Sequence, residues 1–185
     1  MRLSVGQYHG MIASGILNDN MPVELLEGFL ITKMPQNPPH RVTTRFLRIL
    51  LDRLLASYGC YVEMQAPITL ADSEPEPDLT VVQGDPHQFL DRHPGTNDIP
   101  LVIEVSDATL TRDRRSKKRI YAQAGIASYW IVNLVARQIE VYTAPGEVDG
   151  TVTYQSRQDY RRGETIPVIL DGVEIGQVAV NEVLP

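Results

Sequence analysis

The chain has 185 residues, of which 43% are hydrophobic and 22% charged, as in an ordinary globular protein. This length fits one domain and buries about 70% of the unfolded surface, so a core needs neither disulfides nor metal. The net charge of −6 excludes a generally basic nucleic-acid coat protein, and the single Cys60 excludes an intrachain disulfide or a cysteine-based zinc cluster. The N-terminal segment lacks the apolar run of a signal peptide, and no stretch approaches the ~20 apolar residues that span a bilayer, so a cytoplasmic protein without a membrane partner is expected.

The first third of the chain predicts a helix, a hairpin and a second helix. Apolar residues at helical spacing predict a short helix over 4–16. Two apolar runs, 23–26 and 29–31, predict a hairpin, and several prolines then break the chain. A longer helix is expected over 40–58. Its apolar stripe is predicted to comprise Val42, Phe46, Ile49, Leu50, Leu54 and Leu55.

The remaining elements alternate between strands and one helix. Strand-like runs follow at 60–64, 68–70, 79–82 and 101–105. A helix over 112–124 precedes a strand at 128–133, which pairs with 138–142 through a short turn. The order predicts one mixed α/β (α+β) domain over 1–185, with a core at about 8–142 and a β-rich C-terminal extension of antiparallel pieces at 151–185.

Two acidic residues stand at unusual places in the strands. The strand 101–105 is apolar on both faces except at Glu104, which is typical of a central strand. A buried carboxylate without a partner is costly, so Glu104 must face a cation, a metal or water, and a structural ion pair with an arginine is an equal alternative. Asp78 opens the strand 79–82 after Pro77, where on its own it is more simply a turn residue.

The segment 112–119 carries six cations in eight residues, a local positive surface in an acidic chain. Asp113, Lys117 and Tyr121 share one helix face, which puts Lys117 at the margin of the buried side and Lys118 in solvent. The simpler alternative is an ordinary charged helix with an Asp113–Lys117 pair worth a few tenths of a kcal/mol.

Glu24 lies between apolar residues in the predicted hairpin, the same oddity as Glu104. Together with Asp78, these carboxylates would form an oxygen-rich site for a hard divalent cation. A nearby lysine such as Lys117 could orient or deprotonate a water and stabilise charge on a phosphate. The set is the equipment of phosphodiester hydrolysis, and we expect the four side chains to converge in one cleft.

The chain resembles the Uma2 family of the PD-(D/E)XK restriction-endonuclease-like superfamily, from about Tyr8 to Tyr142. The matching stretches are 23–28, His40, 76–79, 101–106, 113–121 and 125–132. The resemblance implies a central mixed sheet flanked by helices and metal-dependent nuclease chemistry.

Residue by residue, Pro77-Asp78 matches the PD element of the superfamily and Glu104 the acidic residue of (D/E)XK. The position of the usual lysine is Ser106 here, and the resemblance points to Lys117 on the following helix instead. Glu24 matches an early acidic residue of the family. Asn133, where the family usually has Asp, is interpreted as structural.

These features favour a Mg²⁺-dependent endonuclease acting on DNA, with Mn²⁺ as a possible substitute. Asp78 and Glu104 would be metal ligands, and Glu24 would assist as a further metal ligand or as a group that orients water. Lys117 would position the attacking water or stabilise the transition state. The alternative is a non-catalytic nucleic-acid-binding or protein-interaction module that keeps the nuclease fold. Cleavage of both strands of a duplex would favour a homodimer, with 151–185 as a candidate interface.

Overall fold

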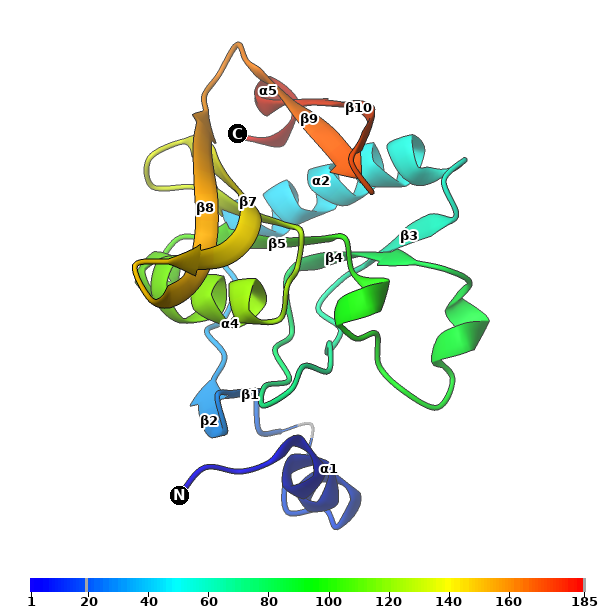
Figure 1. Ribbon diagram of the computed structural model, residues 1–185, viewed down its shortest axis with the longest axis vertical. Helices are drawn as coiled ribbons and strands as arrows, with labels where there is room; N and C mark the ends of the chain where they lie inside the picture. Colours follow the sequence, from blue (N-terminus) through cyan, green and yellow to red (C-terminus); the bar gives the residue numbers. More distant parts are fainter. Residues whose placement is uncertain (19, 185) are drawn as a thin grey trace.

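The structure is a computed structural model that describes residues 1–18 and 20–184 and is built around a six-stranded mixed sheet (Figure 1). The strands, in spatial order, are β3 (Cys60–Glu63), β4 (Leu79–Gln83), β5 (Leu101–Ser106), β6 (Ser128–Asn133), β7 (Gln138–Val148) and β8 (Thr151–Tyr160). β5 and β6 run parallel, and the other neighbours in this sheet are antiparallel. The expected mixed sheet flanked by helices is confirmed.

Helices and two hairpins pack around this sheet. The hairpins are β1 (Val23–Leu26) with β2 (Phe29–Thr32) and β9 (Thr165–Leu170) with β10 (Val173–Ala179). The helices are α1 (Val5–Ala13), α2 (Pro38–Leu55), α3 (Leu110–Arg112), α4 (Lys118–Gln123) and α5 (Val180–Val183), with short 3₁₀ turns at Pro86–Phe89 and Thr96–Asp98. Asp113–Lys117 form a π-helical turn that joins α3 to α4. None of the described helices has the length and apolar character that a membrane span requires.

Each face of the sheet carries its own core. Alternate residues of β5, Leu101, Ile103 and Val105, pack with α2, α5 and the β9–β10 hairpin. Val102, the neighbour of Leu101, packs on the other face with residues of α4. Figure 1 shows this division, with α2 and the C-terminal hairpin on one side of the strands and α4 on the other. Glu104 points to the α4 face, which is where the cations of the following helix lie.

The turn of the β1–β2 hairpin fixes the approach of β1 to the body of the protein. Glu27 and Gly28 have φ values of 49° and 79°, the left-handed pair of a two-residue hairpin turn. A Cβ on Gly28 would lie 2.7 Å from the Cβ of Arg2, so this position also needs glycine for space. The turn therefore lets β1 bury Glu24, whose exposed fraction is 2%.

The helix expected over 40–58 is α2, but its bounds and its buried face differ. It begins at Pro38, because Pro38 and Pro39 occupy the first turn, where a missing N–H costs nothing, and the Asn37 side chain caps it by accepting from the His40 N–H. The predicted stripe is wrong in part, since Val42, Phe46 and Ile49 are 46%, 50% and 39% exposed. The buried residues are Thr43, Thr44, Leu47, Leu51 and Leu55, so the true stripe is rotated toward two threonines.

Other boundaries also change. The segment 68–70 is not a strand: it makes only an isolated bridge between Thr69 and Gly95. Its apolar residues, Ile68 and Leu70, are buried in the core on the α4 face of the sheet. The helix expected over 112–124 starts earlier, at Leu110, and contains the π-helical turn. The antiparallel pieces expected at 151–185 are present as β8, β9 and β10, and the unforeseen α5 follows them.

Candidate active site

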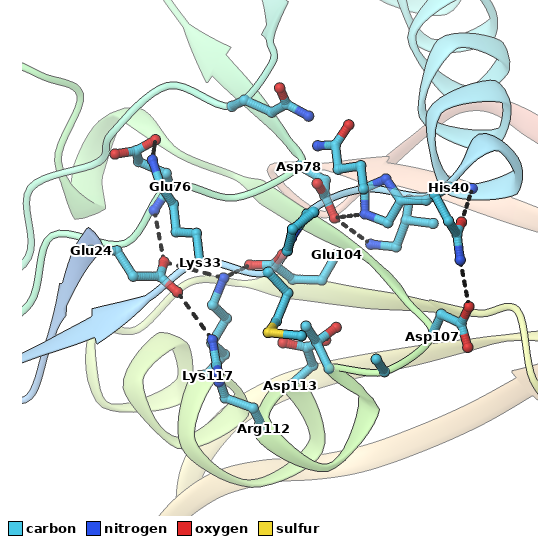
Figure 2. Close-up of a pocket in the computed structure, with 18 of the residues that line it drawn as sticks. Glu24, Lys33, His40, Glu76, Asp78, Glu104, Asp107, Arg112, Asp113 and Lys117 are labelled. Atoms are coloured by element: carbon cyan, nitrogen blue, oxygen red, sulfur yellow. Dashed lines mark hydrogen bonds and ion pairs between the residues drawn. The ribbon is translucent and has the colours of Figure 1, made fainter. Parts of the chain in front are cut away.

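The four residues singled out in the sequence line one cavity of about 520 Å³. Glu24 comes from β1, Asp78 from the residue before β4, Glu104 from β5 and Lys117 from the end of the π-helical turn. Figure 2 shows their side chains pointing toward one another from these separate segments. Only the folded chain brings them together.

Sheet register places Asp78 beside Glu104. The antiparallel β4–β5 ladder pairs Leu79 with Ile103, so the preceding Asp78 lies opposite the residue that follows Ile103. The backbone N–H of Val105 donates to Asp78 Oδ2 at 2.9 Å, and His40 Nε2 lies 3.0 Å from the same oxygen. Asp78 is thus held in position by β5 on one side and by the first turn of α2 on the other.

Lys117 links two of the carboxylates. Its Nζ donates to Glu104 Oε1 at 2.8 Å and lies 3.4 Å from Glu24 Oε2. The surface pair between Lys117 and Asp113 is not formed, because Asp113 Oδ2 accepts instead from Ser106 and Thr109 at 2.6 and 2.7 Å. Both ends of the π-helical turn are buried, which explains how a helix rich in cations sends one of them into the protein.

Glu24 has partners on both oxygens. Oε2 accepts from the backbone N–H of Glu76 at 3.2 Å and faces Lys117, while Oε1 lies 3.9 Å from Arg112 Nη1. The Lys117 ammonium group therefore lies between the carboxylates of Glu24 and Glu104.

Burial sets the electrostatics of the cluster. Burial raises the pKa of Glu104 above its ordinary value, and the nearby carboxylates of Asp113, Asp78 and Glu24 add to the rise against the opposing effect of Lys117. For Lys117, burial alone would lower the pKa, but the carboxylates of Glu104, Glu24 and Asp113 outweigh it and raise the pKa. Lys117 is consequently an ammonium group at neutral pH, and full ionisation of Glu104 beside Asp78, Asp113 and Glu24 needs further positive charge.

Asp78 and Glu104 each keep one carboxylate oxygen for the cavity. The bonds from Lys117 and Tyr121 both end on Glu104 Oε1, and those to Asp78 both end on Oδ2. The second oxygens, Asp78 Oδ1 and Glu104 Oε2, accept no hydrogen bond from the part of the protein that the structure describes. Within residues 1–18 and 20–184, the only fully buried side-chain polar atom without a partner is Thr43 Oγ1, so these two oxygens must reach the solvent of the cavity. Oxygens of this kind suit a hard divalent cation. No three His, Cys, Asp or Glu side chains in those ranges are arranged as a ready metal cage.

Other charged residues that line the cavity received no site role from the sequence, among them Glu76, Lys33, His40 and Asp107. Glu76 and Lys33 form a 2.5 Å ion pair at its wall, and His40 holds Asp78. Glu76 had a detectable signal, since it stands two residues before Asp78 and thus on the same side of an extended segment. Lys33 had none, because only the hairpin path brings it near.

The mixed sheet, with an aspartate and a glutamate on neighbouring strands beside a buried lysine, is the framework of the restriction-endonuclease-like class. The family described as "Uma2: Putative restriction endonuclease" matches residues 5–179, and the chain belongs to this family. A similar solved structure is "a putative nuclease belonging to DUF820" from Anabaena variabilis ATCC 29413, with a TM-score of 0.70. At 13% identity the match covers 94% of this chain and 96% of that one, so it shows a shared fold. No curated protein matches this chain significantly.

Proposed function

We propose that this protein is a divalent-metal-dependent nuclease that hydrolyses phosphodiester bonds in DNA. The observation that carries the proposal is the buried Lys117, placed between Glu104 and Glu24 in the cavity that Asp78 also lines. A structural ion pair would be complete with one carboxylate, whereas this cavity gathers several and leaves carboxylate oxygens facing solvent. Membership of the family described as "Putative restriction endonuclease" supports the same reaction class.

Asp78 and Glu104 are the proposed ligands of Mg²⁺, or of Mn²⁺ in its place. Mg²⁺ in proteins is commonly held by one or two carboxylates, with waters and substrate phosphate completing the shell, so two side chains suffice. A cation there supplies Lewis acidity to the scissile phosphate. Glu24 was expected as a third ligand; its contacts with Lys117 and Arg112 favour instead the task of orienting Lys117.

Lys117 is the proposed electrostatic catalyst. Because its pKa is raised, it donates hydrogen bonds as an ammonium and does not serve as a base at neutral pH. An ammonium that is itself buried at the wall of the cavity stabilises the negative charge that develops on the phosphate in the transition state. His40 and the Val105 N–H hold Asp78, so the remaining Asp78 oxygen faces the cavity in a fixed direction.

The direct test incubates the purified protein with supercoiled plasmid, a linear duplex, single-stranded DNA and RNA, each with EDTA, Mg²⁺ or Mn²⁺. Cleavage of DNA that requires the cation is the predicted result. Binding of nucleic acid without cleavage under any of these conditions would contradict the proposal and favour a non-catalytic module with the nuclease fold.

The proposal extends to assembly and location. Each chain has one candidate active site, which cuts one strand at a time, so efficient cleavage of both duplex strands calls for a homodimer. The proposed place of action is the cytoplasm. Light scattering coupled to size exclusion, with and without duplex DNA, measures the assembly, and a monomer in both conditions would contradict it.

A further inference from the structure

One flank of α2 forms a positive surface that lies outside the lining of the cavity. The helix carries Arg41, Arg45, Arg48 and Arg53 against a single acid, Asp52, in a chain of net charge −6. All five side chains are exposed. Such a local excess of positive charge calls for an explanation in an acidic protein.

Three of these arginines lie on the same side of the helix. At about 100° per residue, Arg41, Arg45 and Arg48 fall within roughly 60° of the helix surface. At about 1.5 Å per residue they extend over about 10 Å, which is close to three steps of axial rise along one DNA strand at about 3.4 Å each, the span of four successive phosphates. The spacing therefore fits a sugar–phosphate backbone that runs along α2.

This flank is continuous with the cavity. His40, the residue before Arg41, lines the cavity and contacts Asp78. At the other end, Arg48 Nη1 lies 3.3 Å from Met64 Sδ, and the next residue, Gln65, lines the cavity too. A strand that lies along the flank would thus meet the carboxylates.

Two of the arginines have no competing partner. Arg48 pairs with Asp52 at 3.3 Å, an exposed contact that contributes little. Across residues 1–18 and 20–184, neither Arg41 nor Arg45 forms an ion pair with an acidic side chain. Both are consequently free to neutralise phosphates.

A second positive surface stands across the cavity. Arg112 lines the cavity, and Arg115 lines the adjacent hollow. Figure 2 places His40 and Arg112 on opposite sides, with Glu104 between them. A nucleic-acid strand that crosses the cavity would meet arginines both before and after the reacting phosphate.

We infer that Arg41, Arg45 and Arg48 form a track that binds the sugar–phosphate backbone of the nucleic-acid strand whose phosphate enters the cavity. The inference rests on the proposed function for its choice of partner, but its contacts are sequence-independent and need no turnover. A second copy of this chain fits the flank less well, because a two-fold contact would set these arginines against one another.

The test measures the affinity of a fluorescent duplex in EDTA over a series of salt concentrations. Arg41→Gln with Arg45→Gln is compared with Arg53→Gln with Arg161→Gln, a control that removes the same charge at exposed positions off the track. The track variant is expected to bind about 10-fold or more weakly at low salt, with the slope of log K against log salt reduced by about two. The control should stay within about 2-fold of the wild type, since its arginines lie outside the path.

Cleavage with Mg²⁺ is measured in parallel, so the two proposals can fail separately. A smaller salt slope for the track variant, in a protein that never cleaves, would support the track and contradict the nuclease. Cleaving wild-type protein with equal slopes for both double variants would overturn the track alone. Unchanged DNA binding together with a loss of dimer in the track variant would also overturn it, and would identify the flank as a contact between copies.

Discussion

Lys117 contacts Glu104 although the two residues are 13 positions apart in the sequence. The residue two positions after Glu104 is Ser106, whose hydroxyl donates to Asp113 Oδ2 at 2.6 Å. Asp113 begins the π-helical turn that ends at Lys117, so Ser106 helps to fix the helix that supplies the ammonium. Ser106, at the position of the usual lysine, thus has a structural role. The positive charge beside Glu104 comes instead from Lys117 in the π-helical turn.

Replacing Lys117 by Ala should lower the cleavage rate by about 100-fold or more, because it removes charge stabilisation in the transition state. Affinity for Mn²⁺ should stay nearly unchanged, since Lys117 is not a ligand. Lys118 provides the matched control: its Nζ lies 5.5 Å from the ring centre of Tyr142, away from the cavity. Lys118→Ala should change only the salt-dependent binding of DNA, and equal small effects of both substitutions would remove Lys117 from the mechanism.

Replacing Glu104 by Gln should leave the metal-free protein as stable as the wild type, or more stable, at neutral pH. Burial raises the pKa of Glu104 from 4.5 to about 8, so the native state holds a proton that the unfolded state has lost in this range. Stability must then fall as pH rises between these values, by up to about 1.4 kcal/mol per pH unit for one proton. Urea unfolding from pH 5 to 8 should show this slope in the wild type and a flatter one in Glu104→Gln. Calorimetry that finds unaltered Mn²⁺ affinity in the variant would exclude Glu104 as a ligand.

Among the elements, the helix that carries Lys117 is tied to the sheet by a second buried carboxylate. Glu140 on β7 accepts from Arg114 Nη2 at 2.5 Å and from Asn133 and Tyr142 at 2.8 Å each. Burial alone would raise the pKa of Glu140, but these donors and the charge of Arg157 outweigh it and lower the pKa to about 2. Because Arg114 lies within the π-helical turn, Glu140 helps to hold the irregular part of the helix.

Glu140→Gln should destabilise the protein by about 1–3 kcal/mol at pH 7, since charge-assisted hydrogen bonds are lost while Arg114 remains partly solvated. The lowered pKa means that the contribution of Glu140 is complete above its ordinary value of 4.5 and disappears as pH falls toward 2. Urea unfolding at pH 7 and near pH 2 checks this. A difference between variant and wild type that persists undiminished near pH 2 would show that the carboxylate charge is not its source.

The elements differ in how far the sequence predicts them. The hairpin β1–β2 and strand β5 were predictable, because turn chemistry and apolar runs act locally. The buried face of α2 was not, since two apolar stripes lie close together and Thr44 is buried by returning a hydrogen bond to the His40 carbonyl at 2.8 Å. The π-helical turn has no local signature, and it decides which cations point inward.

In the whole molecule, the C-terminal residues complete a core that the earlier elements leave open. Ile166 and Val168 of β9 are fully buried, and they belong to the same cluster as Leu47 of α2 and Trp130 of β6. The hairpin β9–β10 therefore stabilises the helix that holds His40 at the cavity.

A substitution pair within β9 tests this packing. Ile166→Ala removes a fully buried side chain and should cost about 2–5 kcal/mol of unfolding free energy. Ile169→Ala alters a side chain that is 47% exposed and should cost within about 0.5 kcal/mol. Chemical denaturation measures both, and similar small losses would mean that β9 adds little to the core.

For the whole molecule, the sequence and the family resemblance predicted the mixed sheet and the gathering of Glu24, Asp78, Glu104 and Lys117. Glu24 and Glu104 stand in apolar runs, where a buried charge needs a partner. The sequence did not show which oxygen of each acid is occupied. Those contacts depend on sheet register, as with Asp78 and the Val105 N–H, and on the path of separate loops.

In the proposed function, Asp78 and Glu104 make cation-dependent cleavage of DNA possible. The most direct measurement of this role is the rate of supercoiled-plasmid cleavage at saturating Mg²⁺ for the wild type, Asp78→Asn and Glu104→Gln, with Glu147→Gln, an exposed acid, as the matched control. We expect cleavage by the wild type and the control that EDTA abolishes, and losses of at least about 100-fold in both site variants. Equal cleavage rates in all four proteins, or a wild-type rate that EDTA leaves unchanged, would contradict the proposed function.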